Sequence, residues 1–575
     1  MRAAIMRWFL ALSISMLVMG ALLATAARAQ EAVGVWHGSL SLPTGAIRIG
    51  VKLTPAAGGD LEGAIFSPDQ SGRDVPLEDV RQEGRRLSFA YPAVRGRFEG
   101  DWDASKSAWV GTWTNVAGSL PLILEAGDIP KGPTVAGLDG DWEGVLTLPA
   151  TKLRIVLHVR TGRYGTVATL DSPDQIAFGL PVSQLARSGQ TVSFRQTATR
   201  LGFSGTLSAD DQAIVGELTQ AAVRPLTLTR RAAHAAALRR PQTPRPPFPY
   251  KAEEVTVESA PGVRLAGTLT LPPGKGPFPA AVLITGSGAQ DRDETIFGHK
   301  PFAVLADDLT RRGVAVLRYD DRGFARSTGD FVKATSADFA VDAAAATAYL
   351  RARPEIDPDR VGLIGHSEGG VVAPMAAAKD PRLGFVVLIA APAAPILEAM
   401  FAQQDAIGPV MGIDPERIQR SRSVFARVMA AMKDAPDQSA AEARAREILV
   451  SEGSHIGIAP DRAGAVARQL ASDWRRTLLE YDPAPNLRAI RAPVLAVNGS
   501  KDVQVVPEVN LPAIRTALGG NRNATILELP GLNHMLQTAT TGAMGEYNDI
   551  EETIAPAALK VIGDWVAAHA RADRP

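Results

Sequence analysis

The segment Val361–Gly370 reads VGLIGHSEGG and places a serine between two glycines in the pattern G-x-S-x-G. An apolar run with β-branched residues precedes the serine and a helix-like run follows it, which predicts a tight strand–turn–helix connection. Bulky side chains do not fit beside such a turn, so Gly365 and Gly369 stand where the backbone needs glycine. Ser367 would then expose its hydroxyl group on a strained turn. This arrangement predicts nucleophilic catalysis by Ser367.

A base must lie close to this serine, because a serine hydroxyl is a poor nucleophile near neutral pH and because the base itself needs an orienting carboxylate. In folds that carry this turn, the acid and then the histidine follow the serine, in loops after later strands. Three histidines follow Ser367. His455 falls in a helical region and His569 in the last expected helix, whereas His534 lies in a loop after the strand-like stretch Ala524–Leu529. We therefore predict that His534 is the base.

The orienting acid is expected just after the apolar run Val494–Val497, where the sequence continues NGSKD. Asp502 closes this stretch at the carboxyl end of a strand, from which its carboxylate can reach an imidazole. Glu508 competes for the role, but it stands where the next helix should begin, and an acidic residue there complements the helix dipole. We predict Asp502 as the acid.

Acyl transfer also needs backbone N–H donors for the developing oxyanion. The N–H of Glu368, directly after the serine, points from a helix N-terminus into the same space. A second donor should come from the loop Thr285–Asp293, TGSGAQDRD, which follows an early strand and whose glycines let the backbone approach closely. We choose the N–H of Ser287, with Gly288 as the alternative.

Two aspartates in that loop, Asp291 and Asp293, suggest a metal site as a second interpretation. Arg292 between them, and the lack of histidine or further suitably spaced carboxylates, favour a structural salt bridge instead. The segment Tyr319–Gly323 is interpreted as a brace for the nucleophile turn. The sequence contains neither a glycine-rich phosphate loop nor an HExxH motif, and we predict no metal and no cofactor.

The elements that must position these residues follow Lys251. Apolar strand-like runs alternate there with helical patterns, which predicts a mostly parallel sheet covered on both faces. Residues of about 393–485 have little strand character and predict a helical cap over the carboxyl edge of the sheet, where such folds bind ligands. Strands are expected at Ala280–Ile284, Val314–Tyr319, Val361–Ile364, Phe385–Ala391 and Val494–Val497, and the clearest helices at Ala337–Arg351, Gly369–Ala378 and Ile554–His569.

Two tandem repeats precede this region, at residues 30–130 and 131–230. The segment Gly34–Gly38, GVWHG, recurs as Gly140–Gly144, GDWEG, and later matches keep nearly the same offset. Each copy alternates apolar and polar residues in short runs, which predicts two all-β modules, each a barrel or a sandwich. Residues 231–250 contain five prolines and predict a semi-rigid linker to residues 251–575.

The opening Gly-x-Trp of each repeat, with Trp36 and Trp142, resembles the start of a lipocalin-like barrel. Such barrels can enclose a small apolar ligand. The simpler interpretation, which we favour, is that both tryptophans close the barrel floor.

Residues 1–29 predict a signal peptide. Arg2 and Arg7 flank the start of an apolar run, Trp8–Leu23, and the segment ends in ARA before Gln30. A membrane anchor is the alternative, but the run is short for a bilayer about 30 Å thick. No second apolar run is long enough to span a membrane. We therefore expect a periplasmic or secreted protein.

Composition restricts both chemistry and partners. The 575 residues are 46% hydrophobic, which is typical of globular proteins, and the length predicts about four units at roughly 150 residues each. The 61 basic and 61 acidic residues balance, so we expect no nucleic-acid partner. The absence of cysteine excludes disulfides, thiolate metal sites and a cysteine nucleophile.

Residues 251–575 resemble a bacterial α/β-hydrolase of the carboxylesterase and serine-aminopeptidase-like group. The motifs behind this resemblance are TGSGAQDRDE from Thr285, YDDRGFARSTG from Tyr319, GHSEGG from Gly365, GSKD from Gly499 and GLNHMLQ from Gly531. The resemblance implies the α/β-hydrolase fold with a helical cap, a triad of Ser367, Asp502 and His534, an acyl-enzyme intermediate and no cofactor. Thr285 stands where many lipases of this superfamily have histidine, which leaves the second oxyanion donor open.

The predicted function is hydrolysis of a small-molecule carboxylic ester. A peptidase or amidase acting on short peptides is one alternative, and it would need carboxylates in the cap to bind a free amino terminus. Glu398, Asp405 and Glu452 are the candidates for that role. The other alternative is a ligand-binding protein with an inert hydrolase domain. The oligomeric state is left open.

Overall fold

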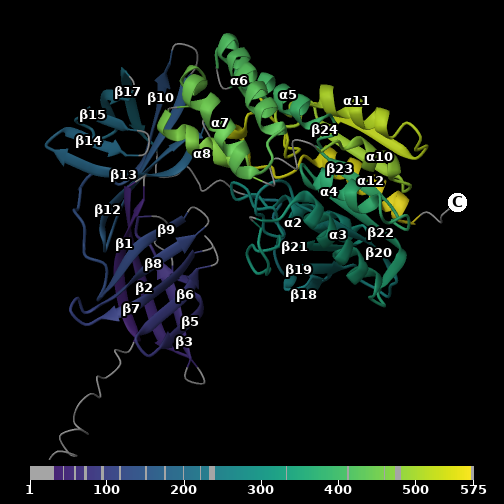
Figure 1. Cartoon of the computed structure of the whole chain (residues 1–575), viewed down its shortest axis with the longest axis horizontal. Helices are drawn as coiled ribbons and strands as arrows, with labels where there is room; N and C mark the ends of the chain where they lie inside the picture. The colour runs from purple at the N-terminus through teal and green to yellow at the C-terminus, as the bar shows by residue number, and fades with distance from the viewer. Residues whose placement is uncertain are drawn as a thin grey trace, which may run out of the picture. The chain divides into compact units, whose positions relative to one another are not determined.

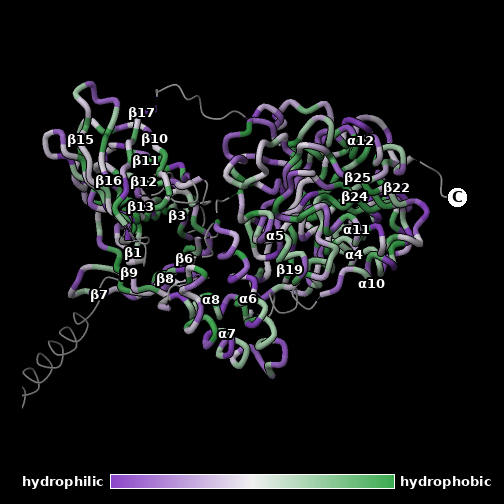
Figure 2. Tube along the Cα trace, turned by 90° about the horizontal axis from the view of Figure 1, so that it is seen from above, coloured by the Kyte–Doolittle hydropathy of each residue, from purple (hydrophilic) through white to green (hydrophobic). Residues whose placement is uncertain are grey.

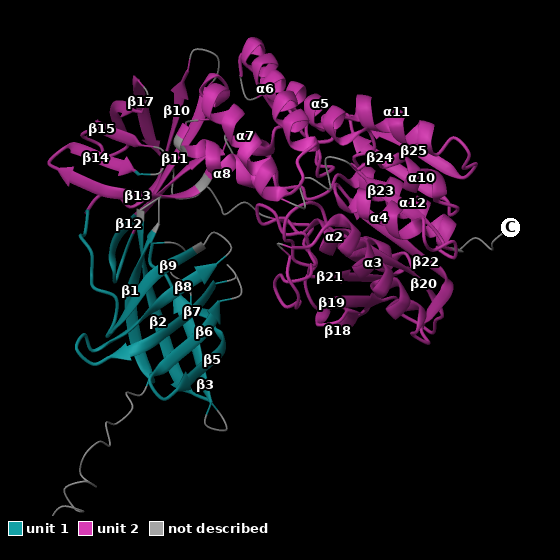
Figure 3. Cartoon of the chain, viewed as in Figure 1, with its two compact units in different colours: residues 1–135, 161–167, 197–199 teal, residues 136–160, 168–196, 200–575 magenta. Residues whose placement is uncertain are grey.

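The chain folds into two compact units, coloured teal and magenta in Figure 3. Unit 1 comprises residues 1–135, 161–167 and 197–199, and unit 2 comprises the rest. The predicted signal peptide lies outside the described residues. The computed structural model describes residues 32–571 except 43–44, 57–59, 70–73, 92–95, 116–117, 149–151, 174–176, 198–199, 221, 232–239, 332, 411–412, 459 and 473–480.

Unit 1 contains a nine-stranded sheet in the order β4-β3-β2-β1-β9-β8-β7-β6-β5, in which every pairing is antiparallel (Figure 1). The N–H of Leu77, between β4 and β5, donates to the carbonyl of Gly63 in β3 at 2.8 Å, so the sheet nearly closes on itself. The strands are β1 (Gly34–Leu42), β2 (Gly45–Pro55), β3 (Leu61–Phe66), β4 (Val75–Pro76), β5 (Glu78–Glu83), β6 (Arg86–Tyr91), β7 (Gly96–Asp103), β8 (Ala108–Asn115) and β9 (Gly118–Ala126).

The second repeat forms a closed barrel in which consecutive strands pair and β10 returns to β17. The strands are β10 (Gly140–Thr147), β11 (Lys152–Gly162), β12 (Gly165–Ser172), β13 (Ala177–Ser188), β14 (Thr191–Gln196), β15 (Leu201–Leu207), β16 (Ala213–Thr219) and β17 (Val223–Arg230). Inward residues alternate with outward ones, as in β14 with buried Val192 and Phe194. The predicted all-β modules are confirmed, and both are barrels rather than sandwiches.

Equivalent tryptophans occupy the cores of the two repeats. The indole N–H of Trp36 donates to the carbonyl of Ala32 at 2.7 Å, and that of Trp142 donates to the carbonyl of Leu138 at 2.8 Å. Both rings are almost fully buried. The matching contacts support the internal repeat and agree with the interpretation that these tryptophans fill the barrels.

The C-terminal region contains an eight-stranded sheet in the order β18-β19-β21-β20-β22-β23-β24-β25. The strands are β18 (Lys251–Ala260), β19 (Val263–Leu271), β20 (Phe278–Ile284), β21 (Ala315–Tyr319), β22 (Ile356–His366), β23 (Val386–Ile389), β24 (Val494–Gly499) and β25 (Ala524–Leu529). The pairings from β21 through β25 are parallel, and β18 and β19 form an antiparallel edge. The prediction of a mostly parallel sheet is confirmed.

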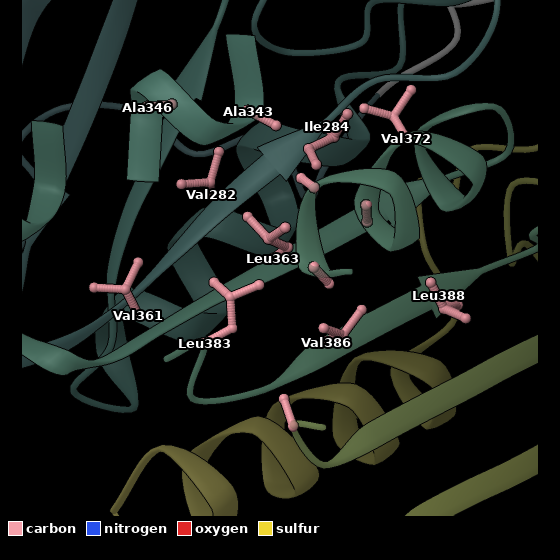
Figure 4. Close-up of a cluster of buried hydrophobic side chains, with 14 of the residues drawn as sticks. Val282, Ile284, Ala343, Ala346, Val361, Leu363, Val372, Leu383, Val386 and Leu388 are labelled. Carbon is pink, nitrogen blue, oxygen red and sulfur yellow. The ribbon is translucent and has the colours of Figure 1, made fainter. Parts of the chain in front are cut away.

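Helices cover both faces of this sheet. Alternate residues of β20 face opposite layers: Val282 belongs to a buried cluster that includes residues of α3, α4, α10 and α11, and Leu283 belongs to a second cluster that includes residues of α2 and α12. Figure 4 shows part of the first layer, with Leu363 and Val386 from neighbouring strands. The helices are α2 (Pro301–Arg311), α3 (Ser336–Arg351), α4 (Gly369–Ala377), α10 (Ala484–Ala489), α11 (Pro507–Ala517), the short η4 (Met544–Glu546) and α12 (Pro556–Arg571).

A helical insertion lies between β23 and β24, as predicted for the cap. Its members are α5 (Ile396–Val410), α6 (Pro415–Lys433), α7 (Gln438–Glu452), the short η3 (Gly453–Ile456) and α8 (Pro460–Leu470). The insertion has a small core of its own, with Val428 and Leu449 fully buried. In Figure 2 these helices carry long hydrophilic stretches, whereas strands such as β22 and β24 are mainly hydrophobic. None of the helices in the described part of the chain is long and apolar enough to cross a membrane.

Candidate active site

Ser367 lies on the tight turn between β22 and α4. Its φ is +53°, a left-handed conformation that a non-glycine residue rarely adopts. The turn is compact: a Cβ atom on Gly365 would lie 2.0 Å from the carbonyl oxygen of Gly369, and one on Gly369 would lie 2.2 Å from that of Ile284. The N–H of Ser367 donates to the carbonyl of Ile389 in β23 at 2.9 Å, which fixes the turn to the sheet. The structure therefore holds Ser367 on the strained turn that the motif predicts.

Asp502 and His534 come together from loops after β24 and β25. The Nδ1 atom of His534 lies 2.8 Å from Oδ2 of Asp502, and both side chains are buried. Oδ1 of Asp502 accepts from the N–H groups of Gln504 and Val505, each at 2.8 Å. Because Nδ1 donates to the carboxylate, Nε2 is left as the nitrogen that can accept a proton.

A cavity of about 210 Å³ opens in front of Ser367. The apolar lining comes partly from α4 and the loops after β23 and β24, and partly from the cap helix α5. Both predicted oxyanion residues, Ser287 and Glu368, also line this cavity, so they border the same space as Ser367. The lining residues are Ser287, Ser367, Glu368, Val371, Pro392, Ile396, Ala399, Met400, Gln403, Gln504, Val505 and Asn510.

The loop after β20, which carries Ser287, is held by a buried aspartate. Asp321 accepts from the Thr285 hydroxyl at 2.7 Å and from the Gln290 N–H at 2.8 Å. Burial raises the pKa of Asp321 to about 8. The segment Tyr319–Gly323 was expected to brace the nucleophile turn; its Asp321 instead fastens the neighbouring oxyanion loop.

Asp291 and Asp293, for which a metal site was the second interpretation, form hydrogen bonds and ion pairs with other residues of the protein. Asp293 forms ion pairs with Lys300, at 2.9 Å, and with Arg318. Asp291 accepts from the N–H and hydroxyl groups of Thr295. Arg292 pairs with neither of them but with Asp320 and Glu254 on neighbouring elements. These contacts agree with a structural role, and the described residues contain no cluster of three or more potential metal ligands.

The remaining candidates lie away from the cavity lining. Glu508 is exposed in the first turn of α11, where the sequence analysis placed it. His455 is exposed in η3, and His569 stacks on Trp565 in α12 with ring centroids 3.9 Å apart.

The cap carboxylates needed by a peptidase are also elsewhere. Glu398 is exposed, and Asp405 pairs with Arg422 at 2.6 Å. Glu452 pairs with Arg427. None of the three carboxylates is among the residues that line the cavity.

One group beside the site had no predicted role. His366, immediately before the serine, lies 2.9 Å from Glu294 and 3.1 Å from the backbone carbonyl of His534. Both residues occur in motifs that carry the resemblance, but no spacing rule connects two positions so far apart in the sequence.

The fold of residues 251–575 is that of the α/β hydrolases, which confirms the resemblance. Residues 261–513 match the family model described as X-Pro dipeptidyl-peptidase (S15 family). The chain is 30% identical over 292 residues to esterase EstD of Thermotoga maritima, which covers 50% of this chain and 61% of that protein. It is 27% identical over 192 residues to acyl-coenzyme A thioesterase 5 of Mus musculus, which covers 31% and 42%, respectively.

Among solved structures, the Pyrococcus furiosus esterase Pf2001 aligns at 14% identity and a TM-score of 0.34, covering 56% of this chain and 90% of that one. In the two sequence matches, the chain spans about three fifths of the length of esterase EstD and less than half of the length of the thioesterase. The sequence matches show esterases, thioesterases and S15 peptidases, all of which are hydrolases. These matches support the prediction of a hydrolase.

Proposed function

We propose that this protein hydrolyses carboxylic esters of small molecules through a covalent acyl-enzyme. The observation that carries the proposal is the hydrogen bond between His534 and Asp502 beside a cavity that Ser367 lines. His534 takes the proton of the Ser367 hydroxyl, and the oxygen attacks the acyl carbon. His534 then gives the proton to the leaving alcohol, and water deacylates the enzyme in a second round of the same steps.

Asp502 keeps the imidazole in the required tautomer and stabilises the imidazolium that forms. The N–H groups of Glu368 and Ser287 are the proposed donors to the oxyanion, with Gly288 as the alternative to Ser287. The chemistry is complete with these groups and requires no metal or cofactor.

The cavity supports an uncharged acyl group of modest size. Its volume is about 210 Å³. Val371, Ile396 and Met400 provide much of the apolar lining. The one ionisable lining residue, Glu368, accepts a hydrogen bond of 2.6 Å from the buried Ser336 hydroxyl, which ties its carboxylate to the protein.

A peptidase is the second candidate, because the matched family model is that of an X-Pro dipeptidyl-peptidase. The positions of Glu398, Asp405 and Glu452 favour the ester, since the lining then offers no cap carboxylate for a free amino terminus.

A panel of substrates separates these functions. We expect turnover of p-nitrophenyl acetate and butyrate, a lower rate for long acyl chains, and little turnover of aminoacyl or X-Pro p-nitroanilides. Acyl thioesters serve as a third arm, given the thioesterase relative. If the enzyme prefers an anilide with a free amino terminus, the proposed substrate class changes from esters to peptides. If the folded protein turns over none of these substrates, the result favours the alternative of a ligand-binding protein with an inert hydrolase domain.

We also propose that the protein is exported to the periplasm or the medium. The support is the signal-peptide pattern of residues 1–29. Expression in a bacterial host, followed by fractionation and N-terminal sequencing, should give a chain beginning at Gln30. A cytoplasmic protein that retains Met1 would contradict this proposal.

A further inference from the structure

His366 and Glu294 form a buried ion pair directly behind Ser367. The His366 Nδ1 atom lies 2.9 Å from Oε1 of Glu294, and the two side chains are only 8% and 4% exposed. On the other edge of the ring, Nε2 lies 3.1 Å from the carbonyl oxygen of His534. Both partners are hydrogen-bond acceptors, so both ring nitrogens carry protons and His366 is an imidazolium.

The electrostatics of the pair agree with this protonation. Burial by itself lowers the pKa of His366, but the charge of Glu294 and the hydrogen bond to it act in the opposite direction, and the net pKa is raised. A buried cation and a buried carboxylate thus neutralise each other beside the candidate nucleophile.

Glu294 also holds the oxyanion loop. The same Oε1 atom accepts from the backbone N–H of Gly286 at 2.7 Å. A Cβ atom on Gly286 would lie 3.2 Å from Cβ of Ser367 and 3.3 Å from Oε1 of Glu294, so the glycine lets the two loops pack directly together. Glu294 itself has φ of +53°, a strained conformation that points to a requirement for its buried carboxylate.

We propose that Glu294 and His366 are positioning residues that hold three catalytic loops in register. The contacts reach the oxyanion loop through Gly286, the nucleophile turn through His366 and the histidine loop through the carbonyl of His534. The inference rests on the proposed function, because it assigns the three loops to one reaction. Neither residue lines the cavity, so both act through the groups that touch substrate.

The geometry explains why the loops need this link. Asp502 fixes His534 through the imidazole, whereas His366 fixes the backbone of the same residue, and the two imidazole rings lie 4.8 Å apart. A displacement of about 1 Å between reacting groups can cost on the order of 10²-fold in rate. Loss of the pair should therefore lower kcat and leave substrate binding nearly intact.

The test uses Glu294→Gln, His366→Asn and the double variant, with Asp342→Asn as the matched control. Asp342 is as buried as Glu294 and pairs with Arg322 at 2.7 Å. Its side chain bonds to Ser259 and Arg322, which lie outside the three loops. The readouts are kcat and KM on p-nitrophenyl acetate, counted per active site by titration with a fluorophosphonate, and Tm. Counting titrated sites removes any contribution of unfolded protein.

Each single variant should lower kcat by about 10- to 100-fold with KM within about threefold. The double variant should lose little more than the worse single variant, because the two residues act as one unit. The control should lose Tm but keep kcat within about twofold.

Wild-type kcat per titrated site in Glu294→Gln would overturn the inference, as would a double variant whose loss equals the product of the single losses. Should His366→Asn give no titratable site, His366→Gln, which keeps a donor near the carbonyl of His534, replaces it under the same criteria. A wild-type protein that neither reacts with the fluorophosphonate nor hydrolyses the ester would instead defeat the proposed function itself.

Discussion

The barrels and the hydrolase region bury very different side chains. In the barrels, the buried polar residues among the described positions are Ser67, Ser172 and Gln196, none of which ionises. In the hydrolase region, buried ionisable residues gather at the carboxyl ends of the parallel strands and in the loops that follow, among them Asp321, His366 and Asp502. Burial of a charge is costly unless it is paired, so such a concentration marks where the fold serves chemistry as well as stability.

The two sheet types explain this difference. The barrels have one interior, which alternating apolar side chains fill: Phe89 stacks on Phe98 in the first repeat, and Phe194 stacks on Phe203 in the second, with centroids 5.1 and 5.0 Å apart. The parallel sheet is buried on both faces, so its polar groups collect at the strand ends, where loops from several strands meet.

The largest expected effect is confined to the hydrolase region. Ser367→Ala and His534→Ala should each lower kcat on p-nitrophenyl acetate by about 10⁴- to 10⁶-fold, and Asp502→Asn by less, because the three groups act as a unit. Tm measured by calorimetry serves as the control for folding. If His534→Ala kept most of the activity, the assignment of the base would be wrong.

Core variants of the barrels should show the opposite pattern. Phe194→Ala should cost about 3–5 kcal/mol of the barrel's stability through the cavity it leaves, and Phe89→Ala should do the same in the first repeat. Both should keep kcat/KM for the small ester within about threefold. If a folded barrel variant lost kcat as well as stability, the barrels would take part in the reaction.

A smaller effect should locate the boundary between the regions. Arg240, in the predicted linker, donates to the carbonyls of Phe297, Asn548 and Ile550, each at 2.9 Å. A chain beginning at Arg240 should therefore keep both Tm and ester activity, whereas one beginning at Lys251 leaves these part-buried carbonyls without that donor. The loss of stability should stay below the figure of about 1–3 kcal/mol per group that applies to fully buried groups.

Thermal unfolding of both truncated chains, with Arg240→Ala in the full chain as the control, measures this effect. Equal Tm values for the two truncated chains would show that the hydrolase region starts after the prolines, as the sequence analysis expected.

The smallest effect concerns a titratable group of the second barrel. His158 lies between Asp171, at 2.9 Å, and Asp141, at 2.8 Å, and the hydrogen bond to Asp171 is the main cause of its raised pKa, against the effect of burial. The raised pKa means that His158 stabilises the fold fully below about pH 6.5, and that this contribution is lost as pH rises through the folded-state pKa.

The Tm difference between wild type and His158→Gln should accordingly be largest near pH 6 and shrink toward pH 9. Calorimetry across that range provides the measurement. A difference that does not change with pH would mean that His158 is neutral in the folded barrel.

Much of this architecture could be predicted from the sequence, because buried strands and tight turns have local signatures. The pattern around Ser367 identified the turn, and the strand ends before Asp502 and His534 placed those residues at one edge. The antiparallel strands β18 and β19 were not predicted, because neither has a continuous apolar run: β18 alternates polar and apolar residues and is half exposed, and the buried β19 has glycine and threonine between its apolar residues. The strand β22 also begins at Ile356, before the apolar run, because that residue pairs with Phe278 beyond an irregularity in the ladder.

The link between His366 and Glu294 could not be predicted either. These residues lie 72 positions apart, and their contact depends on how the loops after β20 and β22 fold against each other. Long-range pairs of this kind follow from tertiary packing and have no periodicity in the sequence.

The most direct test of the central claim is to find which residue acts as the nucleophile. The full chain is treated with a fluorophosphonate, digested and analysed by mass spectrometry. We expect one adduct, on Ser367, prevented by prior reaction with a slowly deacylating ester and absent from the folded Ser367→Ala variant. An adduct on another residue, or none on a folded protein that still hydrolyses the ester, would contradict the account.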